Sequence, residues 1–142
     1  NRECIKTVIK DLTPFDTERK AVEIITQGLI DLNILNGEVN ELIETKAYQK
    51  FYMHKVGHWM GMDVHDVGSY GLNGDWRKYS PGMITTIEPG IYFKEDLKNV
   101  PKEFINIGIR IEDDVLVTEK NPEVLTSSAP KNIKDIEKIM ES

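Results

Sequence analysis

One stretch of eighteen residues, Phe51 to Gly68, constrains the fold of this chain more than any other. It reads FYMHKVGHWMGMDVHDVG and contains all three histidines of the protein, His54, His58 and His65. His54 and His58 are four residues apart, so a helix or a strand would present both on one face. Gly57 and Gly61, which lie between the histidines, disfavour a long helix. We therefore expect a strand that runs into an ordered loop.

Two later acidic residues, Glu88 in TIEPGIY and Glu112 in GIRIEDDVLV, are candidate partners of these histidines. Histidine is the commonest metal-binding side chain, and carboxylates suit harder divalent ions. One histidine with several carboxylates favours Mn, Fe, Co or Zn over Ca or Mg. Two alternatives stay open on these residues alone. Glu112 could form a simple ion pair with Arg110, and Glu88 could face solvent in a turn.

The segment Ile107 to Thr118 gives the clearest strand signal, because apolar residues alternate with charged or small ones. The apolar set is Ile107, Ile109, Ile111, Val115 and Val117, and the opposite set is Gly108, Arg110, Glu112 and Asp114. This period of two predicts one apolar and one charged face, so Arg110 and Glu112 must point the same way. A second β-rich segment, 83–93, contains Pro89-Gly90, which predicts a bend or bulge.

Helical spacing of apolar residues predicts a helix over 16–35, capped by Asp16 and stopped by Asn36-Gly37. Its apolar stripe consists of Val22, Ile25, Leu29 and Leu32. A short helix over 38–46 follows, and residues 1–10 fit the end of another helix. Ile133, Ile136 and Met140 predict a short closing helix. Gly68 to Gly82 and Lys94 to Phe104 are expected to be loops.

The composition narrows the possible partners. A chain of 142 residues fits one domain, and its 18 Lys+Arg against 24 Asp+Glu give a net charge of -6, which argues against nucleic-acid binding. No apolar run approaches the roughly 20 residues of a membrane span, so we expect no membrane association. The single cysteine, Cys4, and the lack of a visible leader favour a cytoplasmic location. Because the chain starts with Asn1 rather than Met, we expect it to be cut from a longer protein.

Three motifs together, HKVGHWMGMDVHDVG, TIEPGIYF and NIGIRIEDDVLVT, resemble the catalytic domain of aminopeptidase P. This is the Xaa-Pro aminopeptidase branch of the creatinase/methionine-aminopeptidase superfamily. The motifs occur in the order typical of the family, and the similarity runs from the region of Asp16 to the C-terminus. The resemblance implies a pita-bread fold of the α/β (α+β) class, with a curved, mainly antiparallel sheet backed by helices. Residues 1–142 resemble the C-terminal half of this domain, without the upstream half or the N-terminal domain.

The resemblance also implies a site for two divalent metal ions, with Mn as the first expectation and Co or Zn as alternatives. His58 matches the single histidine ligand of the family. Glu88, in the EPG motif, matches a glutamate ligand that also acts as general base or proton shuttle. Glu112, in the RIED motif, matches the carboxylate that bridges both metals.

Three further residues match positions around the substrate. His65 matches a histidine that contacts the substrate and stabilises the developing charge. His54 matches a histidine near the substrate that does not bind the metals. Arg110 resembles the arginine that supports the site from the strand face of Glu112. The resemblance therefore assigns catalytic roles to His65, Glu88 and His54.

The chain departs from the family pattern in one respect. The family supplies two further aspartate ligands from strands upstream of these motifs. The upstream aspartates here, Asp11, Asp16 and Asp31, lack that context. We therefore expect three of five ligands in this chain, an incomplete site, and little or no activity of the fragment alone.

For the full-length protein, the resemblance implies a metal-dependent aminopeptidase that acts as a homo-oligomer. It would release the N-terminal residue from peptides with proline in second position. One alternative is a prolidase-like Xaa-Pro dipeptidase. Comparing activity on a dipeptide with activity on a longer Xaa-Pro peptide would distinguish it from an aminopeptidase. The other is a non-catalytic pita-bread module that binds proteins. Such a module has no need of the set His58, His65, Glu88 and Glu112.

Overall fold

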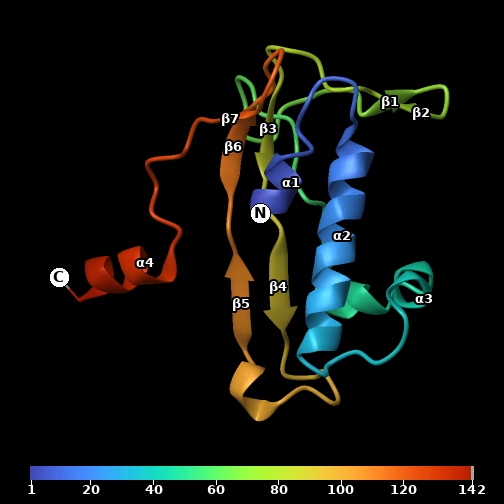
Figure 1. The fold of residues 1–142 in the computed structure, drawn as a ribbon, viewed down its shortest axis with the longest axis vertical. Coiled ribbons are helices and arrows are strands. Elements are labelled where there is room, and N and C mark those ends of the chain that lie inside the picture. The colour runs from blue at the N-terminus through green and yellow to red at the C-terminus, as the bar shows by residue number, and fades with distance from the viewer. Residues whose placement is uncertain (142) are drawn as a thin grey trace.

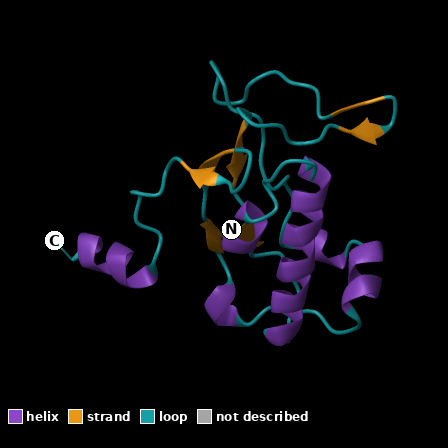
Figure 2. Ribbon diagram, turned by 45° about the horizontal axis from the view of Figure 1, so that its top comes forward, coloured by secondary structure: helices purple, strands orange, loops and turns teal. Residues whose placement is uncertain are grey.

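The computed structural model describes residues 1–141, which include a long helix beside antiparallel β-ladders (Figure 1). The helices are α1 (Arg2–Ile5), α2 (Pro14–Asp31), α3 (Val39–Glu44) and α4 (Ile133–Met140), with 3₁₀ turns at Ala47–Lys50 and Lys102–Phe104. The strands are β1 (Gly71–Leu72), β2 (Asp75–Trp76), β3 (Ile84–Ile87), β4 (Gly90–Phe93), β5 (Ile107–Arg110), β6 (Asp113–Leu116) and β7 (Glu123–Val124). Mixed helices and antiparallel strands confirm the α+β class. Helices α2 and α3 lie on one side of strands β3 to β6, whereas α4 projects away at the C-terminal end (Figures 1 and 2).

Helix α2 starts earlier than the sequence suggested, because its N-terminal cap is Thr13 rather than Asp16. The Thr13 hydroxyl accepts a hydrogen bond from the Asp16 backbone N–H, and the Asp16 carboxylate accepts one from the Thr13 N–H. This reciprocal pair is a capping box, and Pro14 suits the first turn because it needs no N–H donor there. The helix also ends earlier, at Asp31, where Asn33 turns the chain with a φ of 56°.

The core lies between the inner face of α2 and the strands. It consists of Cys4, Val8, Ala21, Val22, Ile25, Leu29, Phe51, Tyr52, Val56, Trp59, Tyr79, Ile87, Phe93, Val115 and Val117. Cys4, the single cysteine, is buried in this core. The stripe of α2 therefore packs as predicted except for Leu32, which follows the helix and is exposed. None of the helices in residues 1–141 is long and apolar enough to cross a membrane.

Each of the two expected long strands is divided in two. The segment 83–93 forms β3 and β4, and the segment 107–118 forms β5 and β6. Strand β6 pairs with β3 and β7 in one sheet, whereas β5 pairs with β4 in another. The expected bend at Pro89-Gly90 is therefore a complete interruption of the ladder.

The two interruptions face each other across the sheet. The last pair of the β3–β6 ladder joins Ile87 to Asp113, and the first pair of the β4–β5 ladder joins Gly90 to Arg110. Both candidate glutamates, one on each strand, lie in the gap between these pairs. The register is the same on both sides of the gap, so Glu88 lies opposite Glu112 and the regular alternation places both side chains on one face.

The predicted apolar face of 107–118 is buried only in part. Val115 is fully buried, but Ile107, Ile109 and Ile111 are exposed, Ile109 to 61%. Periodicity predicts which residues share a face, not whether another element covers that face. In residues 1–141, β5 has β4 as its only ladder partner, and its predicted apolar face is left exposed.

The stretch Phe51 to Gly68, which we call the histidine segment, contains no β-strand, so the expectation of one is wrong. A single bridge joins Trp59 to Thr85, and the segment runs extended along β3. The ladder is irregular because the N–H of His58 donates to the side-chain hydroxyl of Thr86 rather than to a backbone carbonyl. The expected loop at 68–82 also differs, because it contains the β1–β2 hairpin.

Candidate functional site

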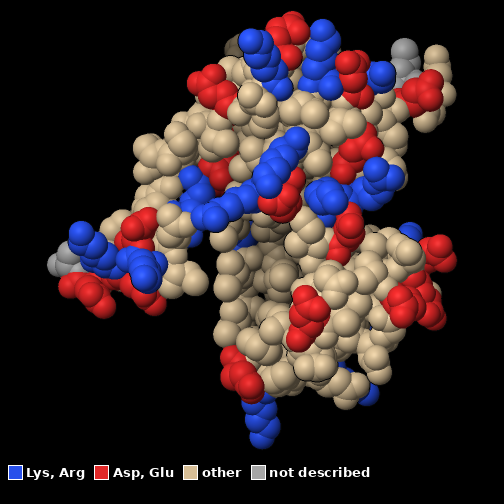
Figure 3. Space-filling model, in the orientation of Figure 1, with Lys and Arg blue, Asp and Glu red and all other residues tan. Residues whose placement is uncertain are grey.

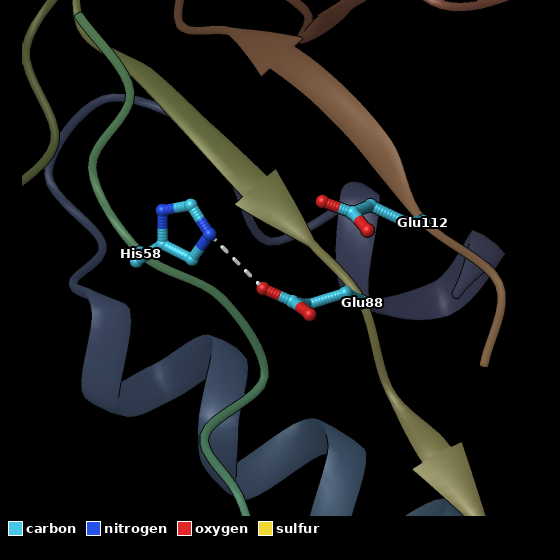
Figure 4. A group of neighbouring side chains, drawn as sticks. All are labelled: His58, Glu88 and Glu112. Atoms are coloured by element: carbon cyan, nitrogen blue, oxygen red, sulfur yellow. Dashed lines mark ion pairs between the residues drawn. The ribbon is translucent and has the colours of Figure 1, made fainter. Parts of the chain in front are cut away.

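Three side chains from three separate segments converge at the gap between the ladders (Figure 4). His58 comes from the histidine segment, Glu88 follows β3, and Glu112 precedes β6. One nitrogen of His58 and one carboxylate oxygen of each glutamate all lie within 4.8 Å of one another. His58 and Glu88 are largely buried, and Glu112 is exposed. The structure thus brings together the three residues that the sequence proposed as metal ligands.

The hydrogen bonds of His58 test whether this group suits a cation. Its Nδ1 lies 3.0 Å from the carbonyl oxygen of Trp59, so Nδ1 must carry the proton in that bond. In the neutral ring Nε2 then has a free lone pair, and it lies 3.2 Å from Oε1 of Glu88. The Nε2 lone pair of His58 and the carboxylates of Glu88 and Glu112 face one another, and none of the three supplies a proton to the others. This donor set fits a divalent transition metal, which would take the place of the missing proton.

Glu88 is held in place by its neighbours. The Thr86 hydroxyl donates to Oε1 at 3.1 Å, and Arg110 Nε lies 3.7 Å from Oε2. The side chain of Glu88 is only 14% exposed, so the alternative of a solvent-facing turn is wrong. The ion pair that Arg110 forms here is with Glu88 rather than with Glu112, the partner in the other alternative. Arg110 and Glu112 nevertheless point toward the same site, as the period of two predicted.

The histidine segment is fixed to helix α2 by Glu18, which the sequence analysis did not single out. Oε2 of Glu18 accepts hydrogen bonds from the Val56 N–H at 2.7 Å and from the Tyr52 hydroxyl at 3.2 Å. Burial, and next the charge of Glu18, raise the pKa of Tyr52, so this hydroxyl stays a donor. No local pattern signals this contact, because 38 positions separate Glu18 from Val56.

The other two histidines flank the site. His54 Nδ1 lies 2.8 Å from the carbonyl oxygen of Lys55, and its Nε2 lies 2.9 Å from the Tyr92 hydroxyl. Nδ1 therefore carries the proton and Nε2 accepts from Tyr92. The ring of His65 is exposed and its centroid is 4.3 Å from that of His58. His65 therefore lies beside His58, and His54 lines the same cavity as these two residues.

The N-terminal residue contributes a contact that sequence patterns could not reveal. The side-chain amide of Asn1 donates to the carbonyl oxygens of Ile87 at 2.9 Å and Ile111 at 3.2 Å. These two carbonyls belong to the residues immediately before Glu88 and Glu112. A single amide thereby joins both strands at the interruption.

A cavity of about 1020 Å³ opens beside the group. It is lined by His54, His58, His65, Glu88 and Arg110, and the aromatic side chains Phe15, Tyr70 and Trp76 also line it. Trp76 stacks on Phe15 with ring centroids 5.3 Å apart. Acidic and basic side chains are interspersed on the face of the molecule in Figure 3. A cavity with apolar walls and a few converging polar groups is typical of a small-molecule or peptide site.

Comparisons with known proteins agree with this geometry. The family model of metallopeptidase family M24 matches residues 1–119. The chain is 50% identical to a Xaa-Pro aminopeptidase of Haemophilus influenzae over 95% of this chain and 32% of the relative. It is 47% identical to the Xaa-Pro aminopeptidase of Escherichia coli over 85% of this chain and 27% of the relative.

Solved structures give the same result. The aminopeptidase PepP of Pseudomonas aeruginosa superimposes with a TM-score of 0.93 at 46% identity, over 97% of this chain and 31% of the other. Proline aminopeptidase P II of Yersinia pestis gives 0.91 at 40% identity, over 99% and 32%. These matches confirm the aminopeptidase P type of pita-bread fold. The chain spans about a third of the length of the curated relatives it matches. By sequence and by fold, this chain belongs to metallopeptidase family M24.

Proposed function

We propose that the complete protein containing this chain is a metal-dependent aminopeptidase that releases the N-terminal residue from peptides with proline in second position. The convergence of His58, Glu88 and Glu112 is the observation that carries this proposal. The names of the relatives support the substrate class, because those at 50% and 47% identity are both called Xaa-Pro aminopeptidases. An E. coli aminopeptidase P in the comparisons is described as being in complex with substrate.

The cofactor in this proposal is a pair of divalent ions, with Mn as the first choice. His58, Glu88 and Glu112 would hold them together with two carboxylates from the part of the domain upstream of residue 1. Residues 1–142 are then the C-terminal part of one catalytic domain. A zinc-substituted aminopeptidase P of E. coli bound to product is among the structural matches, so metal identity needs its own measurement.

Divalent ions at this place would polarise the scissile carbonyl and acidify the attacking water. The residues of the chain do the remaining work. Glu88 accepts a proton from the water and passes it to the leaving amine as general base and acid. Its link to Arg110 keeps its second oxygen oriented. His54 and His65 line the cavity on the histidine segment, where they orient the peptide and stabilise charge that develops on it.

The test compares three substrates with the complete protein loaded with manganese. A tripeptide with proline second should be cleaved, and the same tripeptide with alanine second should not. If only the Xaa-Pro dipeptide is cleaved, the protein is a prolidase-like dipeptidase. If none is cleaved and no metal binds, the protein is a pita-bread binding module and our proposal is wrong.

Calorimetry with manganese tests the share of the site in this chain. Residues 1–142 alone should bind manganese weakly and show no activity, and His58→Ala should abolish the residual binding. Tight binding of two ions by this chain would show that it needs no upstream ligands.

We further propose that the complete protein is a cytoplasmic homo-oligomer, which cell fractionation and sedimentation would test.

A further inference from the structure

Asp113 is a buried carboxylate directly beside the candidate ligand Glu112. Its side chain is 3% exposed, and in the β3–β6 ladder it pairs with Ile87, the residue before Glu88. Asp113 therefore occupies the last rung before the gap in which both glutamates lie. An ionised carboxylate at such a place is costly unless it is paired and hydrogen-bonded.

The partners of Asp113 come from the segment 123–131, which we call the C-terminal arm. Lys131 Nζ lies 2.8 Å from Oδ1 of Asp113, and the Thr126 hydroxyl donates to the same oxygen at 2.7 Å. Lys131 Nζ also donates to the carbonyl oxygens of Thr126 at 2.8 Å and Ala129 at 2.9 Å. All three protons of the ammonium group thus have an acceptor, which makes this a fully satisfied pair.

The backbone of the arm is fixed at the same place. The N–H of Asp114 donates to the Thr126 hydroxyl at 3.1 Å, and the N–H of Leu125 donates to the Asp114 carbonyl at 2.9 Å. Strand β7, at the start of the arm, pairs with β6. Side-chain and backbone contacts together attach the arm to the first two residues of β6, immediately after Glu112.

Asp113 is not available as a further ligand, because its position on the strand alternates with that of Glu112 and its carboxylate is occupied by Lys131 and Thr126. We propose that the Asp113–Lys131 pair, closed by Thr126, is a latch through which the C-terminal arm positions Glu112. Asp113, Thr126 and Lys131 are then positioning residues. This inference rests on the proposed function, since Glu112 has a role to be positioned for only if it binds metal.

The test uses the complete protein and three variants. Thr126→Val removes the hydroxyl, Thr126→Ser keeps it, and Lys131→Met removes the charge that compensates Asp113. Lys10→Met is the matched control, because Lys10 forms an exposed ion pair at 3.3 Å with Glu119, which lies outside the segment 123–131. Manganese affinity is measured by calorimetry, and the visible absorption spectrum of the cobalt-loaded protein reports the geometry of the ligands.

We expect Lys131→Met and Thr126→Val to weaken manganese binding about 10- to 100-fold, as for other groups that orient metal ligands, and to change the cobalt spectrum. Thr126→Ser and Lys10→Met should leave both unchanged. Should Lys131→Met not fold, Asp113→Asn combined with Lys131→Met removes both charges, leaves no unpaired charge buried, and should show the same loss.

The outcomes separate this inference from the proposed function. A wild-type protein that binds no metal and cleaves no Xaa-Pro peptide would remove both. The wild-type protein could bind metal and cleave Xaa-Pro peptides while the folded arm variants show the same manganese affinity and cobalt spectrum. That result would leave the proposed function intact and overturn the latch. A purely stabilising arm would lower the unfolding temperature of these variants without changing the spectrum.

Discussion

Replacing Gly57 with alanine is the most direct test of how closely the histidine segment packs against β3. Gly57 precedes His58 and lies against β3, where a Cβ would come 1.8 Å from the carbonyl oxygen of Thr86 and 2.8 Å from its carbonyl carbon. No side-chain rotation can relieve this contact, because both atoms belong to the backbone of a paired strand. The segment and the strand must therefore separate.

The size of the effect follows from the contacts on either side. An ordinary contact begins at 3.4 Å, so the separation is about 1.6 Å. The hydrogen bond from the Thr86 N–H to the His58 carbonyl is 2.9 Å long, and that from the Glu88 N–H to the Val56 carbonyl is 2.6 Å. Neither survives such a displacement. At about 1 kcal/mol each, their loss predicts a destabilisation of about 2 kcal/mol.

Urea unfolding and manganese calorimetry of the complete protein measure both consequences. Since the displacement moves His58, we expect manganese affinity to fall at least about 10-fold along with stability. Gly28→Ala is the control, because a Cβ at this position in α2 meets nothing within 4 Å. It should stabilise the protein by about 0.5–1 kcal/mol. A Gly57→Ala protein as stable as wild type, with unchanged manganese affinity, would refute the seating described above.

Three further predictions concern single groups. Glu18→Gln weakens the acceptor that holds the histidine segment, so urea unfolding should show a loss of about 1–2 kcal/mol, and an unchanged midpoint would contradict this. Asn1→Ala removes the amide that joins the two strands at the gap, so calorimetry should show about 10-fold weaker manganese binding. Unchanged manganese affinity would show that the amide is dispensable. Burial raises the pKa of Tyr79 from 10.0 to about 12. The folded state therefore holds this proton more tightly than the unfolded state, so the contribution of Tyr79 to stability should be constant below pH 10 and fall by roughly 3 kcal/mol between pH 10 and 12. Tyr79→Phe should lose about 3 kcal/mol less than the wild type over this range, because the raised pKa of Tyr52 contributes to both proteins alike. An equal loss in the variant would contradict this prediction.

The sequence predicted the composition of the site better than its surroundings. The three motifs led to His58, Glu88 and Glu112, and the structure confirms that these side chains meet. The period of two correctly placed Arg110 on the side of Glu112. Their roles in binding metal and substrate stay predictions. Local patterns succeed here because each motif carries its own chemistry and the alternation within a strand is fixed by backbone geometry.

Other features depend on contacts between distant residues, which no local pattern contains. The gap in the ladders has no signal beyond Pro89-Gly90 on one of the two strands. Glu18 lies in the first turns of α2, where no local pattern indicates that it binds the histidine segment. Asp113 belongs by parity to the apolar face, and only the fold reveals that Lys131 compensates it. Whether a face is buried also depends on what covers it, which is why Val115 is buried and Ile109 is not.

The gap between the two ladders also divides the β-structure into units that can open separately. No rung of either ladder crosses the gap, and the carbonyls on the two strands before the glutamates are joined by one amide, that of Asn1. Strand β6 is paired on both sides and carries core residues, whereas the β4–β5 pair has an exposed outer strand. Amide hydrogens of β4 and β5 should therefore exchange through low-energy local opening, and those of β3 and β6 only through near-global unfolding. The two glutamates lie at this boundary. Each is followed or preceded along the chain by a stable strand on one side and by a labile strand on the other.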